Sequence, residues 1–195
     1  MKVIGITGGV GCGKSAILKK LKEKYSCFIF LADDAAKELE KKGNACYESL
    51  VELLGENILG EDREIIPSKM AEAVFENPSL LEKVNAIVHP AVKKYILDSI
   101  EEKKNDGLYE YFFLEAALLI ECGYNEVVDE MWYIFAEEEI RRMRLKNSRG
   151  YTDEKIDSIM KSQLSEAEFK AGSDFTVDNS GDIDNTMSQI YKRLG

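Results

Sequence analysis

A glycine-rich segment of eight residues near the start of the chain constrains its fold more than any other feature. Residues 8–15 are G-G-V-G-C-G-K-S and match the pattern G-x-x-x-x-G-K-[S/T] at every fixed position. An apolar run at residues 3–7 precedes the segment, and residues 14–25 follow it with apolar side chains at helical spacing. The sequence therefore predicts a buried strand, a tight loop and a helix in direct succession.

The residue types of this segment predict a binding site for the phosphates of ATP. Glycines allow the backbone to turn tightly, so that successive N–H groups and the start of a helix can face an anion. Lys14 is expected to reach the β- and γ-phosphates, and the Ser15 hydroxyl to bind Mg²⁺. GTPases, motor ATPases and small-molecule kinases share the motif. A chain of 195 residues without an N-K-x-D run favours the small-molecule kinases.

The rest of the pattern predicts an α/β fold with a mostly parallel sheet flanked by helices. Short apolar runs at residues 28–31, 111–114, 131–135 and 175–177 predict further strands. Helical spacing predicts helices at 34–42, 47–54, 68–75, 79–88, 91–103, 137–146, 152–162, 165–171 and 183–194. Strands that alternate with helices favour parallel pairing through right-handed crossovers.

We expect a single domain over residues 1–195 that is built from three parts. The core is expected at approximately 1–44, 108–136 and 173–195. A helical region that binds the substrate is expected at approximately 45–107, inserted between two strands of the sheet. A helical lid is expected at approximately 137–172.

Composition limits the possible partners and the location of the chain. The formal net charge of −10 disfavours nucleic acid and anionic membranes as partners. No apolar run approaches the roughly 20 residues that a membrane-spanning helix needs. No two of the four cysteines have the C-x-x-C spacing of a zinc or redox site. Scattered cysteines of this kind are typical of reduced thiols. We therefore expect a cytoplasmic protein with small-molecule substrates; the sequence leaves its oligomeric state open.

Two single residues have both a chemical and a structural interpretation. Asp33 follows the second predicted strand, at the end of the sheet where ligands bind in open α/β folds. Its carboxylate can accept the proton of an attacking hydroxyl, or it can cap the next helix. His89, the only histidine, precedes Pro90 and fits either a structural role or a place in a substrate pocket.

Five basic residues lie close together in the predicted lid of this acidic chain. Helical geometry places Arg142, Lys146 and Arg149 on one face, and Arg141 and Arg144 on another. One interpretation is a solvated face that balances nearby glutamates. The other is a lid that brings arginines to a transferring phosphoryl group.

Taken together, these residues resemble the dephospho-CoA kinase family along the whole chain. The similar segments are T-G-G-V-G-C-G-K-S at 7–15, L-A-D-D-A-A-K at 31–37, V-N-A-I-V-H-P at 84–90 and E-A-A-L-L-I-E at 115–121. Arg144-Leu145 in the lid, Gln163 after it and S-D-F-T-V-D-N-S-G at 173–181 complete the set. The loop motif is widespread among kinases, whereas the ordered set is much more specific.

The resemblance implies transfer of phosphate from ATP to the ribose 3′-hydroxyl of dephospho-CoA. It implies Asp33 as general base, with Lys14 and Arg144 completing the catalytic set and Ser15 at the metal. It further implies two sets of contacts. ATP would be bound by Gly9, Val10, Gly11, Cys12, Gly13, Lys14, Ser15 and Ala16. The acceptor would be bound by Thr7, Asp33, Lys37, His89, Glu115, Leu118 and Glu121.

The chain departs from the family pattern at four positions. Leu31 replaces an aspartate, Lys37 an arginine, Ala117 a proline and Ser148 an arginine. Lysine cannot form the bidentate contacts of arginine. Two alternatives therefore stay open: a related kinase that uses another small acceptor, such as a nucleoside monophosphate, and a nucleotide- or CoA-binding protein without turnover.

Overall fold

The computed structural model describes residues 1–75 and 77–195 and divides into two compact units. The first unit comprises Met1–Phe30 and Lys103–Gly195, and the second comprises Leu31–Glu102. The first contains the glycine-rich segment and the residues predicted to form a lid.

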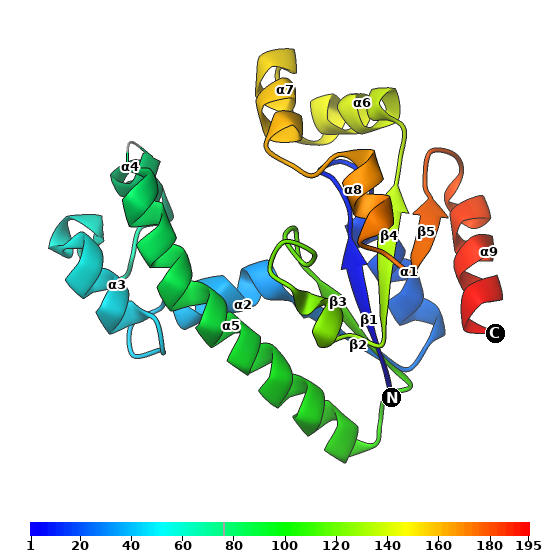
Figure 1. Cartoon of the computed structure of the whole chain (residues 1–195), viewed down its shortest axis with the longest axis horizontal. Coiled ribbons are helices and arrows are strands. Elements are labelled where there is room, and N and C mark those ends of the chain that lie inside the picture. The colour runs from blue at the N-terminus through cyan, green and yellow to red at the C-terminus, as the bar shows by residue number, and fades with distance from the viewer. Residues whose placement is uncertain (76) are drawn as a thin grey trace. The chain divides into compact units, whose positions relative to one another are not determined.

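A five-stranded sheet forms the centre of the fold (Figure 1). Its strands are β1 (Lys2–Thr7), β2 (Cys27–Leu31), β3 (Tyr111–Glu115), β4 (Glu130–Phe135) and β5 (Phe175–Asp178), in the order β2-β3-β1-β4-β5. β1 pairs in parallel with β3 and β4, and β4 pairs in parallel with β5. The predicted fold class is thereby confirmed. The central position of β1 places the glycine-rich loop between its two neighbouring strands.

Helices cover both faces of this sheet. On one face, α1 (Lys14–Lys24) and α9 (Ile183–Leu194) bury apolar side chains such as Ile17 and Ile190 against Ile4, Trp132 and Ile134. Trp132 and Tyr133 are consecutive in β4 and therefore point to opposite faces. On the Tyr133 face, α8 (Glu166–Ala171) stacks the Phe169 ring on the tyrosine with ring centroids 4.9 Å apart.

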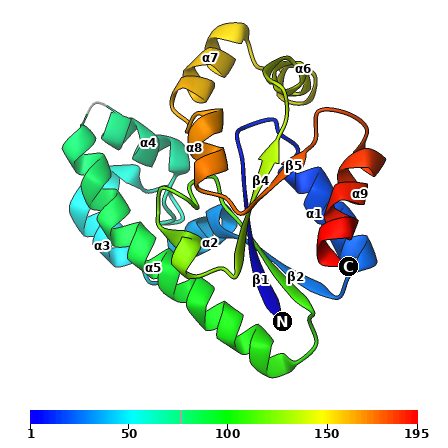
Figure 2. The ribbon, with the colours of Figure 1, turned by 45° about the vertical axis from the view of Figure 1, so that its right-hand side comes forward.

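Two further helices follow β4 and lie beyond its carboxyl end (Figure 2). These are α6 (Glu138–Arg149) and α7 (Asp153–Lys161). Gly150 ends α6 in a left-handed conformation with φ of 63°, which glycine adopts without steric cost. The Thr152 hydroxyl then caps α7 by accepting a hydrogen bond from the Lys155 N–H. The two helices predicted at residues 137–146 and 152–162 are confirmed.

The second unit is helical, and the sequence predicted helices along this part of the chain. Its helices are α2 (Ala32–Leu39), α3 (Tyr47–Leu54), α4 (Pro67–Phe75) and most of α5 (Pro78–Asp106), with a short 3₁₀ turn, η1, at Glu56–Ile58. Tyr47, Ile58 and Leu59 form a small buried cluster. A second 3₁₀ turn, η2 (Tyr124–Glu126), belongs to the first unit.

Two helix predictions in the second unit were wrong. α5 is one helix of 29 residues that contains Pro90, not two helices that meet at the proline. Proline removes only one N–H group from the hydrogen bonds of the helix. Because more than one helical turn lies on each side of Pro90, the helix stays intact. α2 begins at Ala32, directly after β2, so Asp33 lies in its first turn. The N-cap position of α2 is Leu31, and the capping interpretation of Asp33 was therefore also wrong.

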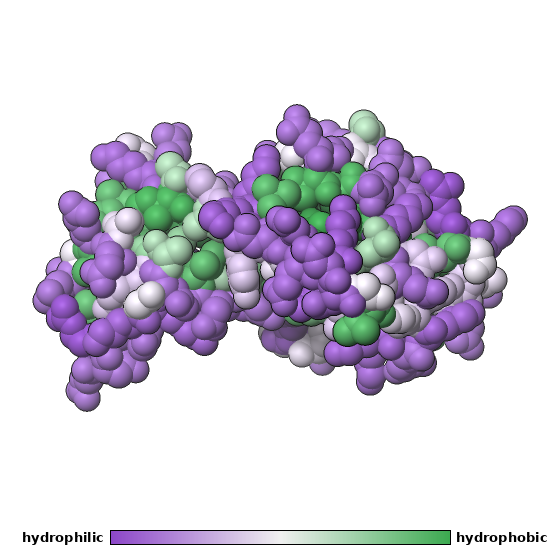
Figure 3. Space-filling view, turned by 90° about the horizontal axis from the view of Figure 1, so that it is seen from below, coloured by the Kyte–Doolittle hydropathy of each residue, from purple (hydrophilic) through white to green (hydrophobic). Residues whose placement is uncertain are grey.

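The surface is mostly hydrophilic on the face drawn in Figure 3, where apolar groups form separate patches. Within the described part of the chain, no helix has both the length and the apolar character needed to cross a bilayer.

Candidate active site

The glycine-rich loop connects the end of β1 to the start of α1 and has the conformation that its motif requires. Gly13 is the N-cap of α1 and adopts a φ of 95°, which a residue with a side chain rarely adopts. A Cβ atom at this position would also overlap the side-chain amide of Asn179. Gly13 therefore allows the loop to enter α1 with the helix N-terminus open to an anion.

Lys14 lies over the loop and is held by two oxygen atoms. Its Nζ donates a hydrogen bond to the Gly8 carbonyl at 2.8 Å and lies 3.5 Å from Glu115 Oε1. Glu115 ends β3 and pairs in register with Ile6, one residue before the end of β1. Both side chains are mostly buried, with exposed fractions of 14% and 17%. The ion pair is therefore poorly screened and fixes the ammonium group at the loop.

Cys12 and Asn179 connect the loop to the segment that follows β5. The Asn179 Nδ2 donates to the Cys12 carbonyl at 2.7 Å, and this bond is buried. Arg144 donates from Nη1 to the same carbonyl at 3.3 Å and from Nη2 to the Asn179 carbonyl at 2.9 Å. The Cys12 side chain is buried in the apolar core, so only its backbone contributes to the surface of the loop.

The two faces of α6 have different partners, as helical spacing predicted. Arg141 and Arg144 contact the loop, from Val10 to Cys12. Arg142 instead pairs with Glu138 and Asp157, and Lys146 pairs with Asp153. The hydrogen bonds that Arg142 donates, first to Asp157 and then to Glu138, raise the pKa of its guanidinium above the usual range. The hydrogen bond that Asp153 accepts from Lys146 lowers the pKa of its carboxyl group.

A pocket of about 430 Å³ opens beside the first turns of α1. This volume lies within the usual range for small-molecule sites. Its lining combines the loop, the lid arginine and the segment after β5: Gly13, Ala16, Lys19, Lys20, Glu23, Arg144, Asn179, Gly181 and Ile183. The sequence predicted only Gly13, Ala16 and Arg144 as site residues. The N-x-G pattern at Asn179 and Gly181 was the available indication of the segment after β5.

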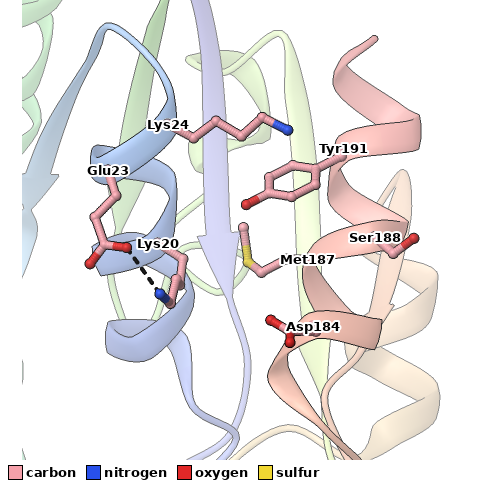
Figure 4. Close-up of a pocket in the computed structure, with 7 residues that line it drawn as sticks. All are labelled: Lys20, Glu23, Lys24, Asp184, Met187, Ser188 and Tyr191. Carbon is pink, nitrogen blue, oxygen red and sulfur yellow. Dashed lines mark hydrogen bonds and ion pairs between the residues drawn. The ribbon is translucent and has the colours of Figure 1, made fainter.

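An adjoining groove of about 550 Å³ lies between α1 and α9 (Figure 4). It shares Lys20 and Glu23 with the first pocket. Lys20 is paired with Glu23 at 3.0 Å, and the Lys24 ammonium lies 3.4 Å from the centroid of the Tyr191 ring. Because these groups already have partners, we regard the groove as an open extension of the pocket.

Other predicted residues of the first unit lie around the loop or in the turns after β3. Ser15 and Ala16 are exposed on the first turn of α1. Thr7 is fully buried at the end of β1, and its Oγ1 has no hydrogen-bond partner among the described residues. Leu118 and Glu121 are exposed in the turns that follow Glu115. The structure thus brings Lys14, Glu115 and Arg144 to the loop.

The remaining predicted residues belong to the second unit. Asp33 and Lys37 are exposed on α2, and His89 is exposed on α5. Lys37 pairs with Asp34 at 2.8 Å, and this hydrogen bond raises the pKa of Lys37.

The residues present fit a magnesium ion that is bound mainly through phosphate. Across residues 1–75 and 77–195, no cluster of three or more His, Cys, Asp or Glu side chains is arranged to hold a metal. Mg²⁺ usually retains several waters and needs only one or two protein ligands beside substrate phosphates. The exposed Ser15 hydroxyl at the start of α1 is suited to that role.

The fold and the loop define the class of the protein and, with sequence comparison, its family. A parallel sheet of order 2-3-1-4-5 with this loop after its central strand is a P-loop kinase core. The family model for dephospho-CoA kinase matches residues 2–185. The chain belongs to the dephospho-CoA kinase family, whose members are ATP-dependent kinases.

Relatives support this assignment over the full length. The chain is 33% identical to the dephospho-CoA kinase of Carboxydothermus hydrogenoformans over 194 residues, which cover 100% of this chain and 93% of the relative. It is 33% identical to that of Aquifex aeolicus over 192 residues, with coverages of 98% and 95%.

Solved structures agree on the fold. TT1252 from Thermus thermophilus superposes with a TM-score of 0.82 at 24% identity, and covers 99% of this chain and 96% of its own. The dephospho-CoA kinase from Campylobacter jejuni gives 0.74 at 20% identity, with coverages of 100% and 96%. Shikimate kinase from Bacteroides thetaiotaomicron gives 0.58 at 14% identity, with coverages of 99% and 97%.

Proposed function

We propose that the chain transfers the γ-phosphate of ATP to the ribose 3′-hydroxyl of dephospho-CoA, the last step of coenzyme A synthesis. The observation that carries this proposal is the loop between β1 and α1, where Lys14 is fixed beside Glu115 at the start of a helix. The full-length family match specifies the acceptor.

On the nucleotide side, the loop residues Gly9 to Ala16 bind ATP. Backbone N–H groups of this loop contact the phosphates, apart from those of Val10, Cys12 and Ala16, which donate to acceptors within the protein. Lys14 neutralises charge on the β- and γ-phosphates as the bridging P–O bond breaks and ADP leaves. Arg144 binds ATP from the lid. The pocket beside α1 has the size and the mixed polar and apolar lining to accept the base and ribose.

On the acceptor side, Asp33 acts as the general base. Its carboxylate accepts the proton of the 3′-hydroxyl while the hydroxyl oxygen forms the new bond to phosphorus. We assign acceptor binding to seven residues: Thr7, Asp33, Lys37, His89, Glu115, Leu118 and Glu121. Mg²⁺, held by Ser15 and the phosphates, supplies additional charge neutralisation when it is bound.

The proposal includes a cytoplasmic location and no nucleic-acid partner. The four cysteines are free thiols, three of them buried, which suits a reducing compartment. The net charge of −10 disfavours association with polyanions other than those that a local cationic site binds.

The decisive experiment measures ADP release from ATP and Mg²⁺ with and without dephospho-CoA. Wild type is compared with Asp33→Asn and with Glu38→Gln, which removes an exposed carboxylate from the same helix. We expect release that depends on the acceptor, a fall in kcat of at least about 100-fold in Asp33→Asn, and little change in Glu38→Gln.

The other outcomes distinguish the alternatives. Faster turnover of a nucleoside monophosphate than of dephospho-CoA would assign a different acceptor. Tight binding of ATP and dephospho-CoA without turnover would indicate a non-catalytic protein. Equal losses in the two variants would remove Asp33 from the catalytic set.

A further inference from the structure

A closed ring of hydrogen bonds joins the lid to one residue of the phosphate loop. Val10 donates its N–H to Gln163 Oε1 at 3.0 Å. Arg141 donates from Nη2 to the same oxygen at 3.3 Å and from Nε to the Val10 carbonyl at 2.9 Å. Gln163 lies in the connection between α7 and α8, whereas Arg141 is on α6. Both ends of the lid therefore contact Val10.

The chemistry of the ring fixes how its members must be oriented. The Val10 N–H and the Arg141 guanidinium are both donors, so only an oxygen can accept from both. The amide of Gln163 must therefore direct Oε1, and not its NH₂ group, toward Val10. Arginine provides the second and third contacts through a planar fork whose nitrogens keep a fixed spacing.

The two arginines of α6 contact carbonyl groups of the loop. A phosphate-binding loop directs successive N–H groups inward, toward the anion. Here the carbonyls of Val10 and Cys12 accept hydrogen bonds from Arg141 and Arg144 on α6. Arg141 thus holds the loop through a backbone carbonyl, a group that cannot donate to a phosphate.

Gly9 makes the close approach of Arg141 possible. A Cβ atom on Gly9 would overlap the guanidinium nitrogens and carbon of Arg141. The φ angle of Gly9 lies outside the left-handed region, so the backbone itself would accept an alanine. The glycine at this position is therefore explained by the arginine and not by backbone conformation.

We propose that Arg141 and Gln163 are positioning residues that hold the phosphate loop in its nucleotide-binding conformation from the lid side. A loop with four glycines among eight residues has many accessible conformations, and fixing it costs entropy when the nucleotide binds. The ring restricts the loop before the nucleotide binds, so that less conformational entropy is lost on binding. The inference rests on the proposed function, because it concerns the same nucleotide site.

Calorimetric titration with ADP and with ATP, each with Mg²⁺, tests the proposal. The variants are Arg141→Met, Gln163→Leu and the double variant, with Arg142→Met as the matched control. Arg142 is the next residue on α6, and it pairs with the carboxylates of Glu138, Asp153 and Asp157. We expect each single variant to weaken both nucleotides roughly tenfold. The double variant should also lose roughly tenfold, not a hundredfold, because the ring is already broken. The control should bind like wild type.

Gly9→Ala provides a second and independent perturbation. It should weaken both nucleotides in the wild-type background and have little further effect together with Arg141→Met. Circular dichroism and thermal unfolding verify that each variant is folded. If a Gln163 variant does not fold, the Gly9 and Arg141 pair still decides the question.

Three results would overturn the proposal. Unchanged affinities in the single variants would show that the ring does not position the loop. A loss for ATP alone would show instead that Arg141 contacts the terminal phosphate. Strictly additive losses would show that the residues act separately. Failure of wild type to bind either nucleotide would contradict the proposed function, and is distinguishable from all three.

Discussion

The two faces of helix α6 have the same charge but different surroundings. Arg141 and Arg144 donate to main-chain carbonyls of the phosphate loop and of Asn179. Arg142 and Lys146 pair with carboxylates of α6 and α7, at distances of 2.5 to 2.8 Å for the shortest contacts. Only one side of the helix is therefore coupled to the candidate active site.

The difference shows how a cluster of basic residues divides its roles. Arg142 and Lys146 are neutralised by nearby carboxylates, and these ion pairs hold α6 and α7 together. The loop-facing cations contact neutral oxygens and so retain their positive charge near the nucleotide site. The sequence-based interpretation of a face balanced by acidic groups therefore fits Arg142 and Lys146, whereas the action of Arg141 and Arg144 on a phosphoryl group stays a prediction.

The sharpest test of this comparison is Arg144→Met against Arg142→Met. Arg144 loses two hydrogen bonds from a charged group and one wall of the candidate base pocket. We expect kcat/KM for ATP to fall about 30- to 100-fold, because hydrogen bonds of charged groups contribute roughly 1.5–3 kcal/mol. Steady-state kinetics with varied ATP measures it.

The control variant should remain within about twofold of wild type, since the carboxylates it leaves unpaired are exposed. Equal losses in the two variants would contradict the separation of the faces.

Much of the fold could be predicted from the sequence because local pattern and tertiary structure agree. The boundaries of α3 and α9 match residue for residue, since apolar spacing and turn residues define both ends. α5 could not be predicted because Pro90 usually ends a helix, and the stability of 29 residues in one helix depends on packing.

The candidate site was predictable only where a motif describes it. Lys14 and Ser15 follow from the loop pattern alone. The roles of Gln163 and Arg141 do not, because both depend on a single backbone residue, Val10, far away in the sequence. No spacing rule connects positions 10, 141 and 163, and only the folded lid brings them together.

A buried ion pair in the first unit provides a reference for the strength of the lid pairs. Glu130 in β4 is 4% exposed and accepts from Lys2 at 2.5 Å and from the Nε of Arg193 at 2.6 Å. Glu130→Gln should lower the free energy of unfolding by roughly 2 kcal/mol, or about 4–8 °C in Tm, because it weakens two charged hydrogen bonds at a buried site. Urea unfolding at pH 7 measures it.

The pH dependence of this effect has a defined sign. Burial raises the pKa of Glu130, but the hydrogen bonds from Lys2 and Arg193 outweigh it and lower the pKa below its usual range. The contribution of ionised Glu130 to the free energy of unfolding is therefore fully present above the pKa of the unfolded carboxyl group, about 4.3. It is lost as the pH falls through the lower pKa of the folded state. The difference between wild type and Glu130→Gln should shrink in acid. A difference that stays constant from pH 7 to pH 3 would contradict the assignment.

The smallest effect is expected for Asp157→Asn, which removes an α7 carboxylate that pairs with the Arg142 face of α6. Asp157 is 56% exposed, and Arg142 keeps Glu138 and Asp153 as partners. Water and salt screen such a pair, so Tm should fall by less than about 2 °C, and the shift should disappear in 0.5 M salt. ATP affinity should not change, because nothing on this face contacts the loop. A Tm shift as large as that of Glu130→Gln, or a loss of nucleotide affinity, would mean that the lid pairs also maintain the active-site face. The two sides of α6 would then form one coupled structure.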